Sequence, residues 1–172
     1  MTEMNTKYLT MVFDKLPLID PSTIDNILGE RKKKHERKDY YYKQKELNPS
    51  INFVVDIASQ FLDLHNITHN NNIWYMDCIR YTLENEKKGI NSGLAWHCEN
   101  DNYPNLISIL FYLTIDENII DGNLRYKDKD NNKNIIKIKS GMTIIMDGRV
   151  VHKPQNPYGS GKRDLIIVSF EL

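Results

Sequence analysis

Several features are scarce in this sequence of 172 residues, and each scarcity excludes a class of protein. Two cysteines, Cys78 and Cys98, cannot build the disulfide framework of a small secreted domain, so we expect a reducing, cytoplasmic setting. No apolar run approaches the ~20 residues of a membrane span, and residues 1–20 carry acidic groups without a signal-type apolar stretch. We therefore predict no membrane partner and no targeting segment. The formal net charge is zero, which argues against a surface that binds nucleic acid over its whole extent.

Alanine is also rare, with two occurrences, whereas Asn, Ile and Lys make up a third of the chain. All three have AT-rich codons, so an AT-rich genome such as that of a large DNA virus or a protist explains the bias. In a viral case the cytoplasmic setting would be the host cytoplasm or a virus factory. Hydrophobic residues at 40% and charged residues at 27% are typical of a folded domain, and the length predicts a single domain over residues 1–172.

The spacing of apolar residues divides the chain into a helical support over residues 1–70 and a strand-rich part over residues 73–172. Pro21 suits the first turn of a short helix, and residues 49–64 have apolar side chains at helical spacing. Strands are expected over 73–83, 106–115, 123–127, 135–139, 142–146 and 165–171, with turns between them that include 158–161. Many short strands with regular turns are typical of a barrel or a double-sheet jelly roll. We therefore predict a mainly β fold with N-terminal helices.

The residues most informative about chemistry are His97 and Glu99. On an extended segment, residues i and i+2 point to the same face, so this imidazole and this carboxylate can bind one cation. His152 follows the strand expected over 142–146 and can supply a third ligand from a different strand. Two histidines and one carboxylate leave three open positions on an octahedral iron(II), the arrangement of non-heme oxygenases. Zinc is the competing metal, but its helical signature with two histidines is absent.

Seven motifs stand in the order of one known family. They are Cys78-Ile79-Arg80-Tyr81, His97-Cys98-Glu99, Leu106 to Asp116, Asp121-Gly122-Asn123-Leu124, Gly141 to Asp147, His152, and Gly161-Lys162-Arg163-Asp164. Through them, residues 79–172 resemble the iron(II)/2-oxoglutarate dioxygenases, specifically the prolyl 4-hydroxylase-like branch. Glu99 departs from the family, which has aspartate there. The loop from Thr82 to Trp96 is longer than in the family, and is either a lid beside the metal or an idle insertion.

The resemblance implies a double-stranded β-helix (jelly roll) that uses Fe2+, O2 and 2-oxoglutarate as cosubstrate, with ascorbate as a candidate reductant. His97, Glu99 and His152 would hold the metal, and no other catalytic side chain is expected.

One cation is expected to bind the distal carboxylate of 2-oxoglutarate. We prefer Arg163 for this role, because Lys162 follows Gly161 and is expected to lie still in a turn. Many collagen-type relatives use lysine, so Lys162 stays open as the alternative. Tyr112, Tyr81 and Leu124 are expected to line the cosubstrate pocket, with ordinary core packing as the alternative for each.

The implied activity is hydroxylation of prolyl residues in a protein or peptide. One alternative is a nucleic-acid demethylase of the same superfamily, suggested by the basic and tyrosine-rich segment from Arg31 to Lys45. Against it, position 169 is Ser where that group usually has a second arginine. The other alternative is a metal-binding jelly-roll interaction module without turnover, which Glu99 keeps open. The remaining histidines (His35, His65 and His69) are expected at the surface, and the oligomeric state is left open.

Overall fold

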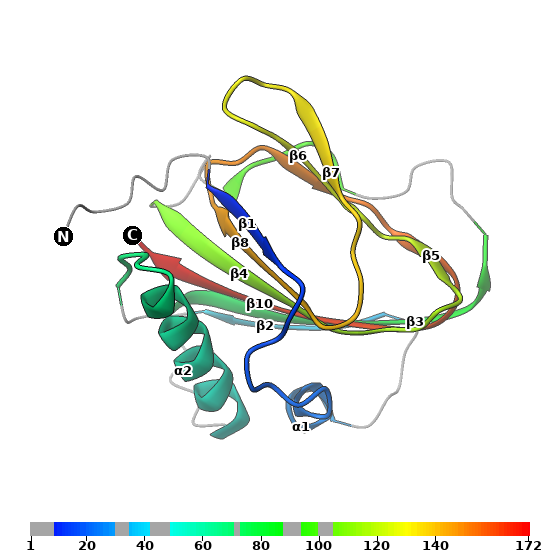
Figure 1. Cartoon of the computed structure of the whole chain (residues 1–172). Helices are drawn as coiled ribbons and strands as arrows, with labels where there is room; N and C mark the ends of the chain where they lie inside the picture. Colours follow the sequence, from blue (N-terminus) through cyan, green and yellow to red (C-terminus); the bar gives the residue numbers. More distant parts are fainter. Residues whose placement is uncertain (1–8, 30–34, 42–48, 71–72, 88–93, 100–104) are drawn as a thin grey trace.

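A computed structural model describes residues 9–29, 35–41, 49–70, 73–87, 94–99 and 105–172. Two antiparallel β-sheets face each other, and two helices lie against the outer face of the larger sheet (Figure 1). This arrangement confirms the prediction of a mainly β jelly roll with N-terminal helices. Among the described residues, neither helix combines the length and the apolar character that a bilayer-spanning segment needs.

Both predicted helices and all the predicted strands occur in the expected order. The helices are α1 (Thr23–Leu28) and α2 (Pro49–Leu64). The larger sheet contains β1 (Thr10–Phe13), β2 (His35–Tyr41), β3 (Ile73–Glu86), β4 (Leu106–Ile115), β5 (Ile119–Asp121), β8 (Met142–Asp147) and β10 (Pro157–Glu171). The smaller sheet contains β6 (Leu124–Lys127), β7 (Lys133–Ile136) and β9 (His152–Pro154). The strand orders are β1-β8-β4-β10-β3-β2, with β5 also paired to β10, and β7-β6-β9. Strands β1, β2, β5 and β9 are additional to the prediction.

Alternation along the central strands builds an apolar core on each face of the larger sheet. Ile109 and Phe111 of β4 belong to the core that α1 and α2 cover, whereas Leu110 and Tyr112 belong to the core between the two sheets. Residues 106–113 of β4 are therefore all buried, which explains why this strand is an almost unbroken apolar run in the sequence. The candidate functional site lies beside the core between the two sheets.

One predicted turn is strand in the structure, and one predicted loop begins as strand. Residues 158–161, expected as a turn, lie within β10, which begins at Pro157 and carries a β-bulge between Gly159 and Gly161. Glycine marks bulges as well as turns, so the sequence pattern does not separate the two. Strand β3 extends to Glu86, so the expected loop from Thr82 to Trp96 begins as strand, and its residues 88–93 lie outside the described residues.

The N-terminal third is less helical than expected. Strand β1 pairs with β8 at one edge of the larger sheet, and its four residues are too few to show alternation in the sequence. Strand β2 pairs with β3 at the other edge. The rest of the candidate nucleic-acid-binding segment from Arg31 to Lys45 lies outside the described residues.

The prediction that His65 and His69 lie at the surface is wrong. The His69 side chain is only 2% exposed, and its Nε2 lies 2.8 Å from Ser59 Oγ on α2. The His65 ring packs against the rings of Phe13 and Phe61, at centroid distances of 4.4 and 4.8 Å. Both imidazoles therefore belong to the layer between α2 and the sheet.

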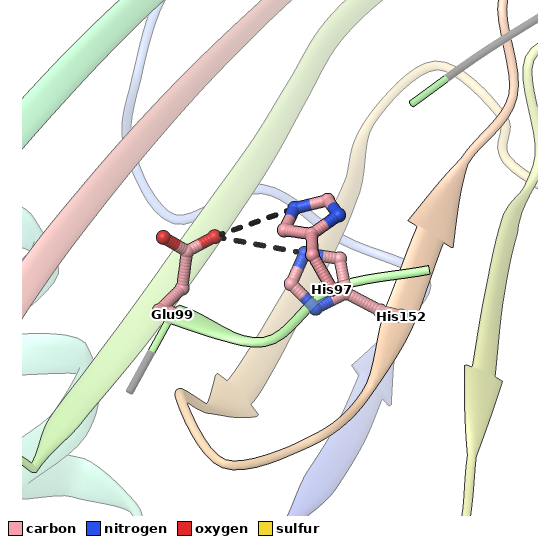
Figure 2. A group of neighbouring side chains, drawn as sticks. All are labelled: His97, Glu99 and His152. Carbon is pink, nitrogen blue, oxygen red and sulfur yellow. Dashed lines mark ion pairs between the residues drawn. The ribbon is translucent and has the colours of Figure 1, made fainter. Parts of the chain in front are cut away.

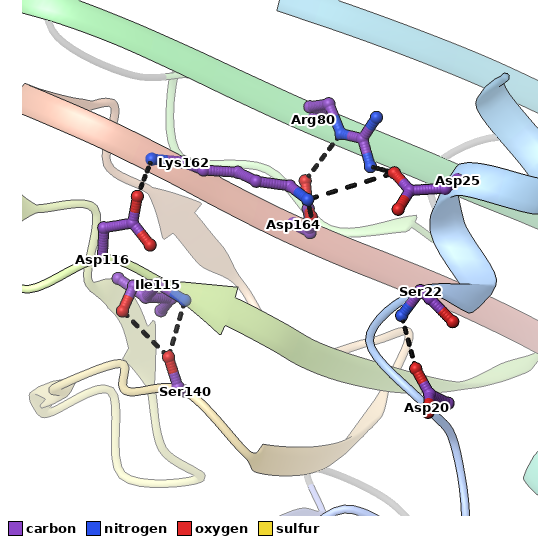
Figure 3. Close-up of polar contacts among 9 residues, drawn as sticks. All are labelled: Asp20, Ser22, Asp25, Arg80, Ile115, Asp116, Ser140, Lys162 and Asp164. Carbon is purple, nitrogen blue, oxygen red and sulfur yellow. Dashed lines mark hydrogen bonds and ion pairs between the residues drawn. The ribbon is translucent and has the colours of Figure 1, made fainter. Parts of the chain in front are cut away.

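An ion cluster with a buried pair at its centre, Arg80 and Asp164, fastens α1 to the outer face of β3 and β10 (Figure 3). Arg80 Nε donates to Asp164 Oδ1 at 3.0 Å, and the same guanidinium pairs with Asp25 of α1. The Lys162 ammonium lies 3.0 Å from Asp164 Oδ2. Burial disfavours the charge on Arg80, but the hydrogen bonds and charges of Asp164 and Asp25 outweigh it and raise the pKa of Arg80. The charges of this cluster therefore depend on one another.

Asp164→Asn is expected to lower the free energy of unfolding by about 3 kcal/mol, because it leaves Arg80 buried without its main counter-charge. Urea denaturation measures the change. Lys139→Met is the matched control, since Lys139 pairs with Asp14 at 3.0 Å but both side chains are more than half exposed. Its expected effect is below about 1 kcal/mol. Equal losses in the two variants would contradict the view that the Arg80 cluster supports the sheet.

Candidate metal centre and adjoining cavity

The backbone brings His97 and His152 together. Each histidine accepts a hydrogen bond from the other's amide, His97 N to His152 O at 3.0 Å and His152 N to His97 O at 2.8 Å. Side chains of such an antiparallel pair project to the same face, and the two rings stand with centroids 4.4 Å apart. Glu99 N donates to Gly148 O at 2.9 Å, which holds the carboxylate on that face. Three backbone hydrogen bonds thus join the segment that contains His97 and Glu99 to residues about 50 positions later in the sequence.

The three side chains converge on one point, as Figure 2 shows. Glu99 Oε1 lies 3.8 Å from His97 Nε2 and 3.7 Å from His152 Nε2. One ligand atom from each residue lies within 4.8 Å of the others. Two imidazole nitrogens and one carboxylate oxygen at this separation fit a first-row divalent metal, with further positions left for other ligands.

The imidazoles are oriented as metal ligands require. His97 Nδ1 lies 2.9 Å from Ala95 O, and His152 Nδ1 lies 3.0 Å from Val150 O. A carbonyl oxygen only accepts, so each Nδ1 carries a proton, and Nε2 is the ring atom that each histidine directs toward Glu99. Burial lowers the pKa of His152 to about 4, against the opposing effect of its hydrogen bond to Val150. His152 is therefore neutral at pH 7.

A cavity of about 570 Å³ adjoins the three side chains, between the two sheets. Arg163 lines it and is only 4% exposed. Its Cζ lies 5.6 Å from the ring centroid of Tyr81 and 5.4 Å from that of Tyr112, and its Nε has no hydrogen-bond partner among the described residues. Leu124 also lines the cavity and is 1% exposed. A buried guanidinium with an unused donor fits an anionic ligand such as a carboxylate.

The two candidate cations point to opposite faces of β10. Lys162 lies in the strand, not in a turn as the sequence suggested, and its ammonium faces Asp164 and Asp25 on the helix side (Figure 3). Arg163 faces the cavity, as do Leu165 and Ile167. Strand β10 pairs with β3 without interruption from Gly161 to Ser169, so alternation puts Lys162 and Arg163 on opposite faces, and the sequence left open only which of the two faces lines the cavity.

Burial raises the pKa of the Tyr112 phenol, while the positive charge of Arg163 and a hydrogen bond with it act in the opposite direction. Tyr112 therefore keeps its proton at pH 7 and can donate a hydrogen bond into the cavity.

Several residues that line the cavity were not predicted from the sequence. Tyr75 and Asp77 line the cavity together with Ile79 and Tyr81, all on one face of β3. The period of two along the strand, counted back from Tyr81, is the signal that could have found them. Gln155 also lines the cavity from the connection between β9 and β10, where no sequence pattern indicates it.

Comparison with known proteins gives a result at the level of structure. The sequence matches no protein-family model and no curated protein. A prolyl-4-hydroxylase from Pseudomonas putida is similar with a TM-score of 0.59 at 11% identity, over 95% of this chain and 92% of that one. An oxidoreductase of the 2OG-Fe(II) oxygenase family from Burkholderia pseudomallei also gives 0.59 at 11% identity, over 80% of this chain and 65% of that one.

A third similar structure is the viral collagen prolyl hydroxylase from Paramecium bursaria Chlorella virus-1, solved with 2OG. Its TM-score is 0.54 at 15% identity, over 95% of this chain and 96% of that one. The chain has the 2OG-Fe(II) oxygenase fold. The fold that the resemblance implied is thus confirmed. Within this oxygenase fold, the cluster of His97, Glu99 and His152 could hold a metal ion.

Replacing His152 by alanine removes one of the three proposed metal donors. Mutation of a residue that only supports a ligand typically weakens metal binding by roughly 10–100-fold, and we expect His152→Ala to weaken Mn2+ binding by more than this. Isothermal titration calorimetry with MnCl2 measures this. His69→Ala is the control, since it also removes a buried imidazole but on the helix side of the larger sheet. Unchanged Mn2+ affinity in His152→Ala, or an equal loss in His69→Ala, would contradict the assignment.

Proposed function

We propose that the protein is an iron(II)- and 2-oxoglutarate-dependent oxygenase that hydroxylates prolyl residues of a protein or peptide. The observation that carries the proposal is a single cavity that brings together a metal-type donor set and a buried arginine. Both are present on an oxygenase fold whose similar structures include prolyl hydroxylases.

In this proposal His97, Glu99 and His152 hold iron(II). The neutral His152 ring needs no deprotonation before it binds a cation, and the carbonyls of Ala95 and Val150 orient both rings with Nε2 toward Glu99. Glu99 adds one methylene to the aspartate of the resembling family, and the geometry above already places its oxygen less than 4 Å from both nitrogens. The longer side chain therefore still reaches the common point.

Arg163 binds the distal carboxylate of 2-oxoglutarate, and Tyr112 adds a phenolic donor beside it. Leu124 and Leu165 supply apolar walls that keep water from this charge pair. When bound, the metal with 2-oxoglutarate and O2 would supply the oxidising chemistry: 2-oxoglutarate loses CO2 and takes one oxygen atom of O2 to become succinate, and the other oxygen atom enters the C–H bond as a hydroxyl group, with ascorbate as the candidate reductant that keeps the iron in its divalent state. The protein's own contribution is to bind, to orient and to exclude water.

The prolyl substrate is supported by two kinds of observation. Two of the similar structures are named as prolyl hydroxylases, one of them for collagen. Trp74, Tyr75 and Leu94 give the cavity an aromatic and apolar wall, which suits a pyrrolidine ring.

The demethylase alternative depends on a second arginine at the position of Ser169. Ser169 is buried, and its Oγ lies 2.7 Å from Ser108 Oγ. The position that would carry that group's second arginine thus shares the side of β10 that carries Arg163, but it holds a small hydroxyl that is bonded to Ser108.

The deciding experiment measures succinate formed from 2-oxoglutarate with Fe2+, O2 and ascorbate, with and without a proline-rich collagen-type peptide. Mass spectrometry of the peptide detects the added oxygen. Succinate formation with hydroxylated proline is the expected result, and the same peptide with alanine in place of proline is the control. Metal binding without any succinate would favour the interaction module, and hydroxylation elsewhere would overturn the prolyl assignment.

Arg163→Met is expected to raise the Kd for 2-oxoglutarate about 100-fold or more. Loss of one partner of a buried ion pair costs about 3–5 kcal/mol, and 1.4 kcal/mol corresponds to tenfold. Lys162→Met is the matched control on the opposite face of β10 and is expected to change the Kd less than about threefold. Calorimetric titration of the Mn2+-loaded proteins compares them. The reverse order would assign the carboxylate to Lys162.

A further inference from the structure

The Arg163 guanidinium is held closely by the turn between β5 and β6, at Gly122. A β-carbon at position 122 would lie 2.8 Å from Arg163 Nη1, 3.4 Å from Arg163 Cζ and 3.2 Å from Pro157 Cβ. The first distance is well inside van der Waals contact, and the guanidinium is much less free to move than the end of an exposed arginine, since Arg163 is 4% exposed. The bare α-carbon of Gly122 is therefore part of the wall against which the guanidinium rests.

We propose that Gly122 is a positioning residue for Arg163, and that the absence of a side chain at this position keeps the guanidinium out of the space where a carboxylate binds. The inference rests on the proposed function, in which Arg163 binds the distal carboxylate of 2-oxoglutarate. The rings of Tyr81 and Tyr112 flank the same guanidinium at 5.6 and 5.4 Å. A side chain at 122 would thus drive the guanidinium from the turn toward the cavity.

Hydrogen bonds and strand pairing restrain the backbone of the turn, so it cannot easily move away from Arg163. Asp121 and Gly122 both have positive φ, at 64° and 77°. The Asp121 carboxylate accepts hydrogen bonds from the side chains of Asn123 at 3.0 Å and Gln155 at 3.3 Å, and Gln155 N donates to Asn123 O at 3.0 Å. On its other side β5 pairs with β10 through Asp121 and Pro157. Because the turn is tied on both sides, a methyl group at 122 must displace Arg163 more than the backbone.

The test compares Gly122→Ala with Gly141→Ala. Gly141 has the same φ of 77°, but a β-carbon there has no atom within 4 Å among the described residues, so this variant carries the backbone strain without the contact. Calorimetry measures the Kd for Mn2+ and then the Kd for 2-oxoglutarate of the Mn2+-loaded protein. We expect Gly122→Ala to weaken 2-oxoglutarate binding at least tenfold while the Mn2+ affinity stays within about twofold, and Gly141→Ala to change neither by more than about twofold.

Each outcome decides one question. Wild-type protein that binds no 2-oxoglutarate would overturn the proposed function. Wild-type and Gly141→Ala proteins that bind it, with Gly122→Ala binding equally well, would overturn only the positioning role. Parallel losses of Mn2+ and 2-oxoglutarate affinity in Gly122→Ala would also overturn that role, because they indicate general damage.

A second substitution tests the proposal if the Gly122→Ala protein does not fold. Arg163→Lys replaces the branched guanidinium with a slimmer ammonium and removes the Nη1 atom that the methyl group would meet. If Gly122→Ala alone fails to fold, the double variant Gly122→Ala/Arg163→Lys is expected to regain a cooperative thermal transition. Failure of the double variant to fold, while Arg163→Lys alone folds, would place the damage in the turn and overturn the inference.

Discussion

The paired hydrogen bonds between His97 and His152 are the interaction on which the site depends. They join the segment 94–99 to strand β9 and so to the smaller sheet. Because the pairing is between backbones, the direction of both imidazoles follows from strand geometry, and side-chain packing only refines it. The bond from Glu99 to Gly148 then places the carboxylate by the same means. A ligand set assembled in this way needs only two short stretches of sequence and a closed jelly roll to hold them.

The two faces of strand β10 have different roles. Arg163, Leu165 and Ile167 line the cavity, whereas Lys162 and Asp164 point to the helix side and join the ion cluster with Arg80. The period of two therefore puts a ligand-facing cation and a structural charge pair on adjacent residues. The ion cluster fixes the backbone on either side of Arg163, and the turn at Gly122 limits the far end of its side chain. The position of one guanidinium is thus set from both faces of the sheet.

Much of the fold was predictable because the relevant patterns are strong. The apolar spacing over residues 49–64 predicts α2 with its observed bounds, and the run over 106–115 predicts a strand buried on both faces. His97, Glu99 and His152 were predictable as a group because alternation and the order of motifs agree. The bulge in β10 was not predictable, since glycine has the same appearance in a bulge and in a turn. The contact between Gly122 and Arg163 depends on how the turn folds over β10, which no local pattern encodes.

The place of β10 in the larger sheet has a consequence for how the chain reaches its folded state. Strands β3 and β4 are not paired with each other, and β10 lies between them. Arg80 and Asp164, which meet across this pairing, are 84 residues apart in the sequence. During synthesis the two halves of the sheet are therefore expected to stay apart until β10 leaves the ribosome, and β4, which is buried on both faces over residues 106–113, lacks one neighbour for that time. Such late, long-range pairing makes folding slow and exposes an aggregation-prone strand edge, so this chain is expected to depend on chaperones more than a helical protein of its size.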